Sequence, residues 1–329
     1  MPASIVGRAL LALGTAALVA FTAAPVAGQG TYPDRPIKMI LPFSAGGGTD
    51  VVGRIVAKGL SDRLGQQVVV ENRAGAGSTI GTAAVAAAPP DGYTLLFASA
   101  AHSYSPTVYS NLPYKPDDFI AVAVVNTTPL MVTVNPSKVP ARDLKSFIAL
   151  LKANPGKFNY GSSGNGTTLH IGAEYFNTQA GVNVVHVPYK GEAPGMKDLL
   201  SGEIAYMVNQ ASSSVPYLKS GQLVALGVTT PKRVPSLPDV PTVSEAALPG
   251  FAGYGWNAIL VPKGTPRTVV DKLNREINAV IASPEVQQKF TELGLGNVDP
   301  TTPEAATAFI AAETTKWAPV IKAAGIKGN

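Results

Sequence analysis

The stretch Pro42-Phe43-Ser44-Ala45-Gly46-Gly47-Gly48-Thr49-Asp50 joins an apolar run, Ile37–Leu41, to a segment with apolar residues at helical spacing. This order predicts a strand, a glycine-rich turn and the start of a helix. Glycines let the backbone approach a ligand closely, and the amides and dipole of a helix N-terminus favour an anion. A nucleoside triphosphate site carries Lys-Ser/Thr after its last glycine, whereas this chain has Thr49-Asp50. We therefore expect a different anion, with a simple strand-to-helix turn as the alternative.

A second glycine-rich turn has the same surroundings. Gly161-Ser162-Ser163-Gly164-Asn165-Gly166-Thr167-Thr168 follows an expected strand, Phe158–Gly161, and precedes an expected helix, Thr168–Ala180. The two turns lie about 120 residues apart. Two anion-binding turns in one chain predict two α/β lobes that face each other across a ligand cleft.

Strand-like runs alternate with helical patterns along the chain, which predicts a parallel α/β sheet. The other expected strands are Val68–Glu71, Thr94–Ala98, Ala121–Val125, Met131–Asn135, Val184–Val187, Ile204–Asn209, Leu223–Thr229 and Asn257–Val261. The other expected helices are Thr49–Leu64, Ser78–Ala88, Ala193–Leu200 and Ser214–Ser220, followed by three that begin at Thr265-Pro266, Ser283-Pro284 and Thr302-Pro303. Each of these three starts predicts a hydroxyl N-cap followed by proline at the first helical position. The proline-rich segment Pro231–Gly250 predicts an ordered loop.

Residues 1–28 have the pattern of a secretory signal peptide. Arg8 precedes an Ala/Leu/Val-rich core, and small residues stand before Gln29, where we expect cleavage. The apolar run is short and alanine-rich for a membrane span, and no basic stop-transfer flank follows it. We therefore expect an exported, periplasmic protein.

Composition narrows the class of the mature chain. About 300 residues remain after the leader, 46% of all residues are apolar and 14% are charged, which predicts a large folded core. The absence of cysteine excludes disulfides, thiolate metal sites and a cysteine nucleophile. The net charge is +5, with one charge from Arg8, and no basic run is interleaved with aromatics, so nucleic-acid binding has no support. A mild positive field favours an anionic ligand.

Two motifs invite other chemistry. Gly75-Ala76-Gly77-Ser78-Thr79-Ile80-Gly81 lacks the third glycine of a dinucleotide site, and we interpret it as a turn and helix start. Gly161-Ser162-Ser163-Gly164-Asn165 resembles a nucleophile elbow but ends in Asn165. A cleft hydrolase that uses Ser162 or Ser163 remains an alternative, and it requires a paired histidine and acid.

The three histidines, His102, His170 and His186, share no metal-ligand spacing, so we expect no metal and no cofactor. We expect His186 in the core or between lobes, and His170 in local hydrogen bonds. His102 follows an expected strand near the cleft and is a candidate ligand contact. Asp50 is expected as a cap or structural partner rather than an acid catalyst.

Seven segments, in order along the mature chain, resemble the Bug receptors, the periplasmic solute-binding proteins of tripartite tricarboxylate transporters. These are residues 36–50, 71–77, 90–96, 160–170, 187–191, 237–245 and 262–266. The resemblance implies a type II-like periplasmic binding protein, in which two α/β lobes joined by two crossing strands close on the ligand. Lobe 1 is expected at 29–130 plus 255–329, and lobe 2 at 131–254, with hinges near Val125–Asn135 and Pro249–Asn257.

The same resemblance implies a monomeric receptor, not an enzyme. It implies that backbone amides and ordered waters bind a small mono-, di- or tricarboxylate, which is delivered to the membrane components of the transporter. A ligand-dependent sensory partner protein remains an alternative. Asn209 stands where relatives commonly have an acid, which favours a plain carboxylate over an amino acid. The expected ligand-binding residues are Phe43, Ser44, Ala45, Gly46, Gly47, Gly48, Thr49, Asp50, Ser99, His102, Gly161, Ser162, Ser163, Gly166, Thr167, Thr168, Tyr189 and Asn209.

Overall fold

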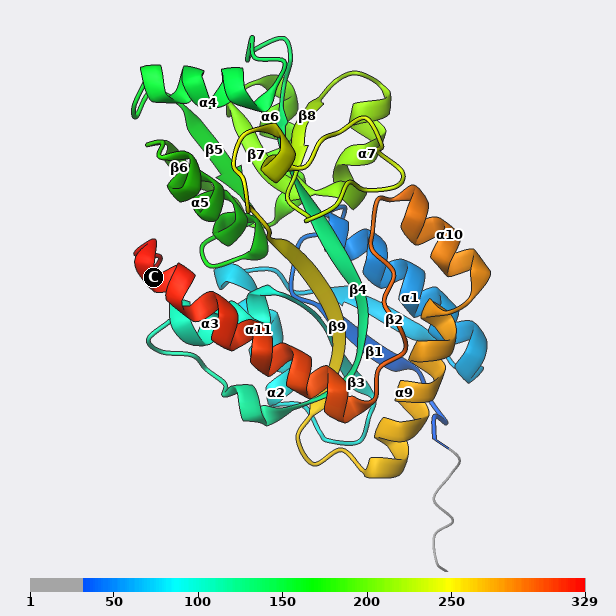
Figure 1. Cartoon of the computed structure of the whole chain (residues 1–329). Helices are drawn as coiled ribbons and strands as arrows, with labels where there is room; N and C mark the ends of the chain where they lie inside the picture. The colour runs from blue at the N-terminus through cyan, green and yellow to red at the C-terminus, as the bar shows by residue number, and fades with distance from the viewer. Residues whose placement is uncertain (1–31, 329) are drawn as a thin grey trace, which may run out of the picture. The chain divides into compact units, whose positions relative to one another are not determined.

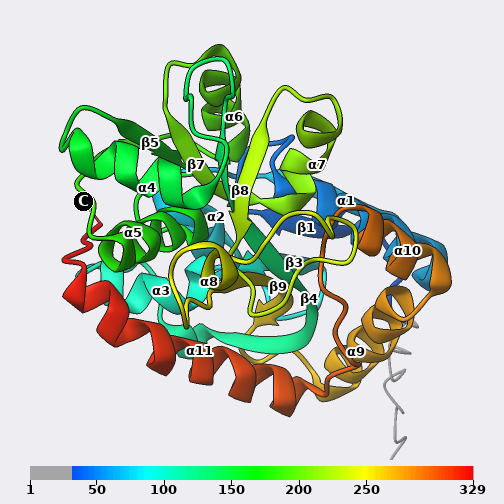
Figure 2. The same ribbon diagram turned by 45° about the horizontal axis from the view of Figure 1, so that its top comes forward.

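The computed structural model describes residues 32–328, which form a nine-stranded sheet with helices packed on it (Figure 1, Figure 2). The predicted leader, residues 1–28, lies outside the described residues. Among residues 32–328, no helix is both long enough and apolar enough to cross a membrane.

The secondary structure follows the predicted alternation. The strands are β1 (Ile37–Leu41), β2 (Val68–Asn72), β3 (Thr94–Ser99), β4 (Phe119–Val134), β5 (Asn159–Ser162), β6 (Val185–Pro188), β7 (Tyr206–Gln210), β8 (Val224–Val228) and β9 (Tyr254–Pro262). The α-helices are α1 (Gly48–Leu64), α2 (Thr79–Ala86), α3 (Ala101–Val108), α4 (Leu144–Ala153), α5 (Thr168–Ala180), α6 (Glu192–Ser201), α7 (Ala211–Lys219), α8 (Val243–Ala246), α9 (Arg267–Ile281), α10 (Pro284–Glu292) and α11 (Pro303–Ala323). Two short 3-10 helices, η1 (Ala76–Ser78) and η2 (Pro116–Asp118), complete the set.

The sheet is mixed rather than wholly parallel, which corrects the expectation from the sequence. Its order is β2-β1-β3-β9-β4-β7-β5-β6, and β8 pairs with β4. Parallel pairs join β1 to β2 and β3, and β5 to β6 and β7. By contrast, β9 is antiparallel to β3 and β4, and β4 is antiparallel to β7 and β8. The parallel strands therefore form two groups, separated by the long antiparallel strands in the middle.

Strand β4 replaces two shorter expected strands, Ala121–Val125 and Met131–Asn135. The segment between them, with Asn126 and Pro129, has the composition of a break but lies inside the strand. Residues Phe119–Pro129 pair with β9, and Leu130–Val134 pair with β7 and β8. Pro129 thus lies where the strand changes partner, a place where its missing N–H is tolerated.

This change of partner gives a working division of the chain. We call residues 33–130 with 255–328 lobe 1, and residues 131–254 lobe 2. One apolar cluster includes Leu96, Trp256 and Trp317, and another includes Phe147, Tyr160 and Phe176. Helix α11 packs on α3 and β4, and α5 packs on β5 and β7. The two groups of parallel strands therefore pack on different apolar clusters, and β4 contributes residues to both.

The observed helix N-termini can be compared with the three predicted N-caps. Ser283 and Thr302 accept hydrogen bonds from the amides of Val286 and Ala305, so two of the three predicted caps are confirmed. The third is displaced by one residue, because Pro266 is the N-cap of α9 and Thr265 Oγ1 donates to the Pro262 carbonyl. Three helices, α3, α4 and α8, have no counterpart in the expected elements, and α8 lies inside the segment expected to be a loop.

Candidate functional site

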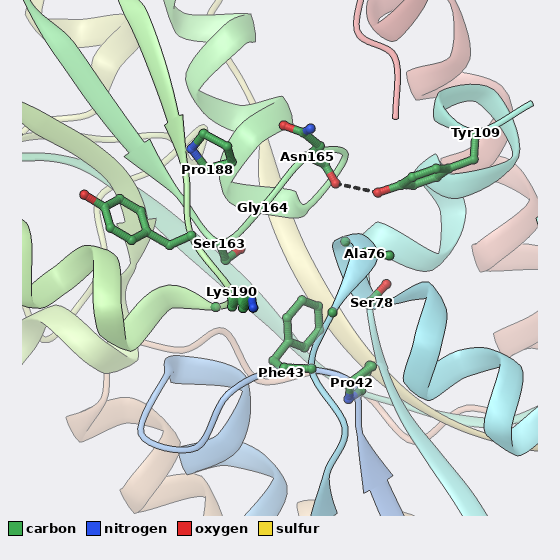
Figure 3. A pocket seen from close by; sticks show the side chains of 15 residues that line it. Pro42, Phe43, Ala76, Ser78, Tyr109, Ser163, Gly164, Asn165, Pro188 and Lys190 are labelled. Carbon is green, nitrogen blue, oxygen red and sulfur yellow. Dashed lines mark hydrogen bonds between the residues drawn. The ribbon is translucent and has the colours of Figure 1, made fainter. Parts of the chain in front are cut away.

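A cavity of about 330 Å³ lies where four loops meet, two from each lobe (Figure 3). Each of these loops follows a parallel strand, β1, β2, β5 or β6, and Tyr109, at the end of α3, completes the wall. The lining residues are Pro42, Phe43, Ala74, Gly75, Ala76, Gly77, Ser78, Tyr109, Ser163, Gly164, Asn165, Pro188, Tyr189, Lys190 and Gly191. Ligand sites of α/β sheets lie outside the carboxyl ends of the strands, so this is the position at which a ligand is expected.

The loop after β2 is the turn and helix start predicted from the sequence, and it also lines the cavity, which was not predicted. Four successive residues, Gly75, Ala76, Gly77 and Ser78, all have positive φ. Ala76 and Ser78 are the two non-glycine residues with positive φ among those described. Such conformations are uncommon for non-glycine residues and gather at functional sites. The alternating glycines were the available signal in the sequence.

A second, much smaller cavity adjoins the first and shares Phe43 and Ser163 with it. Its volume is about 10 Å³, close to the space of one water molecule. It is lined by Phe43, Gly47, Gly48, Thr49, Ser99, Ser163, Thr168, Leu169, Glu192 and Gln210. Both glycine-rich turns singled out in the sequence thus contact one continuous region between the lobes.

The start of α1 holds a carboxylate, and this carboxylate belongs to the protein. Glu192 Oε2 accepts from the Gly48 amide at 2.8 Å. Its Oε1 accepts from the Gln210 amide at 2.8 Å and from Ser213 Oγ at 2.6 Å. Glu192 is 5% exposed. Burial raises the pKa of its carboxyl, against the opposing effect of these three hydrogen bonds. Glu192 and Gln210 were missed in the sequence because no local motif marks a residue that acts across lobes.

Asp50 has the structural surroundings expected of it. Its carboxylate accepts from the Gly46 amide, from Arg54 Nε and from Asn72 Nδ2 at 2.8 to 3.0 Å. Burial raises the pKa of this carboxyl, but the hydrogen bonds outweigh burial and the net pKa is lowered. Asp50 therefore fixes the turn between β1 and α1 and does not line either cavity.

The second turn is held by its own side chains. Thr167 caps α5: its Oγ1 accepts from the His170 amide and donates to the Gly164 carbonyl. The Gly166 amide donates to His170 Nδ1 at 3.0 Å. The His170 ring stacks on His186 with centroids 4.0 Å apart, and burial lowers their pKa values to about 3 and about 4. Both rings are therefore neutral at pH 7.

The structure contains part of the geometry that a serine hydrolase requires, a serine paired with a histidine. Ser162 Oγ lies 2.6 Å from His186 Nε2, but Ser162 is 0% exposed and lines neither cavity. Among the described residues, no carboxylate hydrogen-bonds to His186. Ser163 lines both cavities, yet no histidine within residues 32–328 hydrogen-bonds to it. The serine with a histidine partner and the serine within reach of a substrate are thus different residues.

Two expected ligand contacts lie elsewhere. His102 is 6% exposed, packs against Tyr114 and Phe119, and borders a separate cavity beside α11. Burial lowers the pKa of its ring to about 4. Asn209 is fully buried in β7, where its Oδ1 accepts from Thr133 Oγ1 at 2.8 Å. Successive strand side chains point to opposite faces, and Asn209 points toward Met196 while its neighbour Gln210 reaches the small cavity.

The remaining expected residues divide by position. Phe43, Ser163 and Tyr189 line the larger cavity, and Gly47, Gly48, Thr49, Ser99 and Thr168 line the smaller one. The other expected residues line neither cavity: Ser44, Ala45 and Gly46 lie in the first turn, Gly166 and Thr167 in the second, and Gly161 in β5. Within the described residues, no group of three or more potential ligand side chains is placed to hold a metal ion.

Direct contacts join the lobes beside the cavities. Besides the bond between Gly48 and Glu192, Gln210 Nε2 donates to Thr49 Oγ1 at 3.2 Å. On the other side, Tyr109 Oη donates to the Asn165 carbonyl at 2.8 Å, as the dashed line in Figure 3 shows. We call the contacts of Ser44–Thr49 with Gly191, Glu192 and Gln210 the interlobe seam.

A family model described as "Tripartite tricarboxylate transporter family receptor" (TctC) matches residues 52–326. The chain belongs to this family. It is similar to protein BugT of Bordetella pertussis, with 38% identity over 97% of this chain and 98% of BugT. The match to BugT extends over both lobes and the cavity, whereas the family model begins after the first glycine-rich turn.

Solved structures agree with the fold. The periplasmic binding protein BugD matches with a TM-score of 0.87 and 38% identity over 91% of this chain and 100% of BugD. Rpa4515 of R. palustris, solved with adipate, matches with a TM-score of 0.87 and 34% identity over 90% and 99% of the two chains. MatC of Rhodopseudomonas palustris, solved with bound malate, matches with a TM-score of 0.84 and 31% identity over 88% and 100%. The fold is that of the periplasmic binding proteins.

Proposed function

We propose that this protein is a periplasmic receptor that binds a small organic carboxylate between its lobes. We further propose that it delivers this ligand to the membrane components of a tripartite tricarboxylate transporter and performs no catalysis. The observation that carries the proposal is the cavity of about 330 Å³ at the ends of four parallel strands. Its place and size are those of a small-molecule site.

The charge of this cavity favours an anion. Lys190 is the one charged residue among the residues that line it. The hydroxyls of Ser78 and Ser163 and the backbone of three glycine-containing turns supply hydrogen-bond donors around it. Hydrogen bonds to a charged acceptor contribute about 1.5 to 3 kcal/mol each. Several such donors and one ammonium group are sufficient for a carboxylate without an arginine.

The ligand class is supported by the relatives. Adipate was found with Rpa4515 and malate with MatC, and both proteins match this chain at 31% identity or more. Both ligands are small dicarboxylates. We therefore place dicarboxylates first among the candidates for this chain, ahead of mono- and tricarboxylates.

A thermal-shift screen tests the proposal. Mono-, di- and tricarboxylates are compared with the amides of the same carbon skeletons, which keep the shape and lose the charge. A ligand at 100 times its Kd raises the free energy of unfolding by about 2.7 kcal/mol. We expect at least one carboxylate to raise Tm and its amide to leave it unchanged. Equal shifts with acid and amide, or no shift with any carboxylate, contradict the proposal.

Lys190 offers a second test of the same site. Replacing Lys190 by Gln removes the single positive charge of the cavity wall, and we expect weaker carboxylate binding that depends less on salt. Lys152, an exposed lysine of the same lobe on α4, is the matched control. If Lys190→Gln and Lys152→Gln bind the ligand equally well in calorimetry, the carboxylate is held elsewhere.

A further inference from the structure

Glu192 lies where the starts of three helices converge. It is the first residue of α6, and its carboxylate accepts from the Gly48 amide at the start of α1. It also accepts from the Gln210 amide at the N-cap of α7 and from Ser213 Oγ in the first turn of α7. Helix N-termini carry positive partial charge and free amides, so the starts of α1 and α7 together form an anion site for the Glu192 carboxylate.

The donors of this site come from both lobes. Gly48 belongs to lobe 1, and Gln210 and Ser213 belong to lobe 2 with Glu192 itself. A buried carboxylate requires such donors, because removing them leaves an uncompensated charge. Separation of the lobes therefore breaks the bond to Gly48 and leaves the start of α1 without its anion.

The backbone around Glu192 is shaped for this close approach. A Cβ on Gly48 would overlap Gln210 Oε1 and Ser212 Oγ, and a Cβ on Gly191 would overlap Ser44 Oγ. Gly191 also has a φ of +128°, which favours glycine. Both glycines therefore allow the two lobes to come within hydrogen-bonding distance at Glu192.

We propose that Glu192 is an interlobe latch: its carboxylate occupies the anion position at the start of α1 and holds lobe 2 against lobe 1. The carboxylate of a bound ligand then lies in the neighbouring cavity of about 330 Å³ rather than on the Gly48 amide. This inference rests on the proposed function only for the identity of the ligand. Glu192 is a positioning residue, which sets how readily the binding loops meet.

Fluorescence energy transfer between the lobes measures the latch without a ligand. The chain contains no cysteine, so labels attach only at introduced sites. Lys58→Cys on α1 and Lys152→Cys on α4 are exposed positions in lobes 1 and 2. Glu192→Ala, Glu192→Gln and the control Glu203→Gln are compared in this background. Glu203 is exposed on lobe 2 and its side chain accepts no hydrogen bond within the described residues.

Chemical rescue separates the latch from a merely structural glutamate. Glu192→Ala leaves space for a small anion at the starts of α1 and α7, whereas the amide of Glu192→Gln fills that space. We expect lower energy transfer in both variants, and a return toward the wild-type value in Glu192→Ala alone when sodium acetate or formate is added. Sodium chloride and acetamide serve as controls, and wild type and Glu203→Gln are expected to show no acetate effect on energy transfer.

The outcomes are distinct. Wild-type energy transfer in Glu192→Gln and Glu192→Ala, with circular dichroism confirming that both are folded, overturns the latch. If Glu192→Ala does not fold, Glu192→Gln alone decides the question. For a carboxylate that binds the wild type in the thermal-shift screen, we expect the Kd of Glu192→Gln to be at least about tenfold higher than that of the wild type. Failure of every carboxylate to bind the wild type overturns the proposed function but leaves the energy-transfer result as the test of the latch.

Discussion

The two glycine-rich turns look alike in the sequence and are stabilised in opposite ways in the structure. The first, Phe43–Asp50, receives its anion from the other lobe, because Glu192 of lobe 2 accepts from the Gly48 amide. The second, Gly161–Thr168, satisfies its helix start with local side chains, Thr167 and His170. The helix start of the first turn is therefore satisfied by the other lobe, whereas the helix start of the second is satisfied within lobe 2, and that turn receives its bond from lobe 1 at the Asn165 carbonyl.

This difference separates two uses of glycine. Gly48 has no positive φ and is required by the space that Gln210 and Ser212 leave for it. Gly164 and Gly166 have φ values of +121° and +71°, which favour glycine whatever surrounds them. Substitutions in the first turn should therefore change closure and binding, and those in the second turn should change folding.

Acidification is expected to have the largest effect, and to act on the second turn. The folded pKa values of His170 and His186 lie near 3 and 4, below the ordinary value of 6.5. Their stabilisation is therefore fully present above pH 6.5 and is lost as the pH falls toward the folded pKa. Between pH 7 and pH 5 we expect a loss of about 2 kcal/mol in the free energy of unfolding for each histidine.

Urea unfolding at the two pH values measures this loss. His102, whose pKa is also lowered to about 4, adds to it from outside the turn, so a variant is required to assign the effect. His186→Gln keeps a hydrogen-bond acceptor for Ser162 and does not titrate. Between pH 7 and pH 5, the free energy of unfolding of His186→Gln should fall by about 2 kcal/mol less than that of the wild type. An identical pH dependence in both proteins would show that the stacked pair is not what responds.

In the first turn, Gly48→Ala should have the next largest effect. The new Cβ would overlap Gln210 Oε1 and Ser212 Oγ across the seam, and overpacking costs about 1 to 3 kcal/mol. We expect ligand affinity to fall by about tenfold to a hundredfold, with little change in Tm. Gly47→Ala is the comparison, since the φ of Gly47 is −80° and its new Cβ would lie 3.3 Å from Glu192 Cβ, a tight contact that a small shift relieves, rather than an overlap. Calorimetry of both variants should rank Gly48→Ala far below Gly47→Ala; similar affinities would refute the spatial explanation.

The sequence predicts the parts of this site that depend on local order. The strand–turn–helix pattern places both turns and the caps at Thr302 and Ser283 correctly, because each is decided within a few residues. Helix α4 carries its own signal in the Asp143 cap and its apolar spacing, although the sequence analysis assigns no element there. Helix α3 has a weaker signal in the sequence, because Pro106 and several polar residues obscure the helical spacing of its apolar residues.

The parts that depend on long-range contacts are the ones that were missed or misplaced. Asn209 and Gln210 are neighbours in β7, and only the sheet decides which of them reaches the cavity. The role of Glu192 requires Gly48, which lies 144 positions earlier in the chain. His102 follows a strand toward the expected cleft, yet α3 carries it to the side of α11.

Tyr109→Phe should have a moderate effect, confined to the contact between lobes. The change removes the hydrogen bond from Tyr109 Oη to the Asn165 carbonyl and keeps the ring in place. A neutral hydrogen bond contributes about 0.5 to 1.5 kcal/mol, so affinity should fall several-fold while the lobe cores are unchanged. Tyr217→Phe, in α7 away from the cavity, is the matched control. If energy transfer between the lobes is the same in the two variants, Tyr109 does not contribute to closure.

The smallest effects should distinguish two adjacent threonines, and they test whether the second turn contacts the ligand at all. Thr167 Oγ1 is a helix cap, so Thr167→Val should lower the free energy of unfolding by about 1 kcal/mol.

Thr168 Oγ1 is buried beside the small cavity and has no hydrogen-bond partner in the described part of the chain. A buried hydroxyl without a hydrogen-bond partner does not stabilise the fold, so Thr168→Val should not lower the free energy of unfolding. If that hydroxyl receives the ligand or a bridging water, Thr168→Val should instead weaken binding by about 0.5 to 1 kcal/mol. Urea unfolding measures the stability of each valine variant, and calorimetry measures its affinity for the ligand. Normal binding by Thr168→Val would mean that the second turn only supports α5, and that lobe 2 reaches the ligand through Ser163 and Lys190.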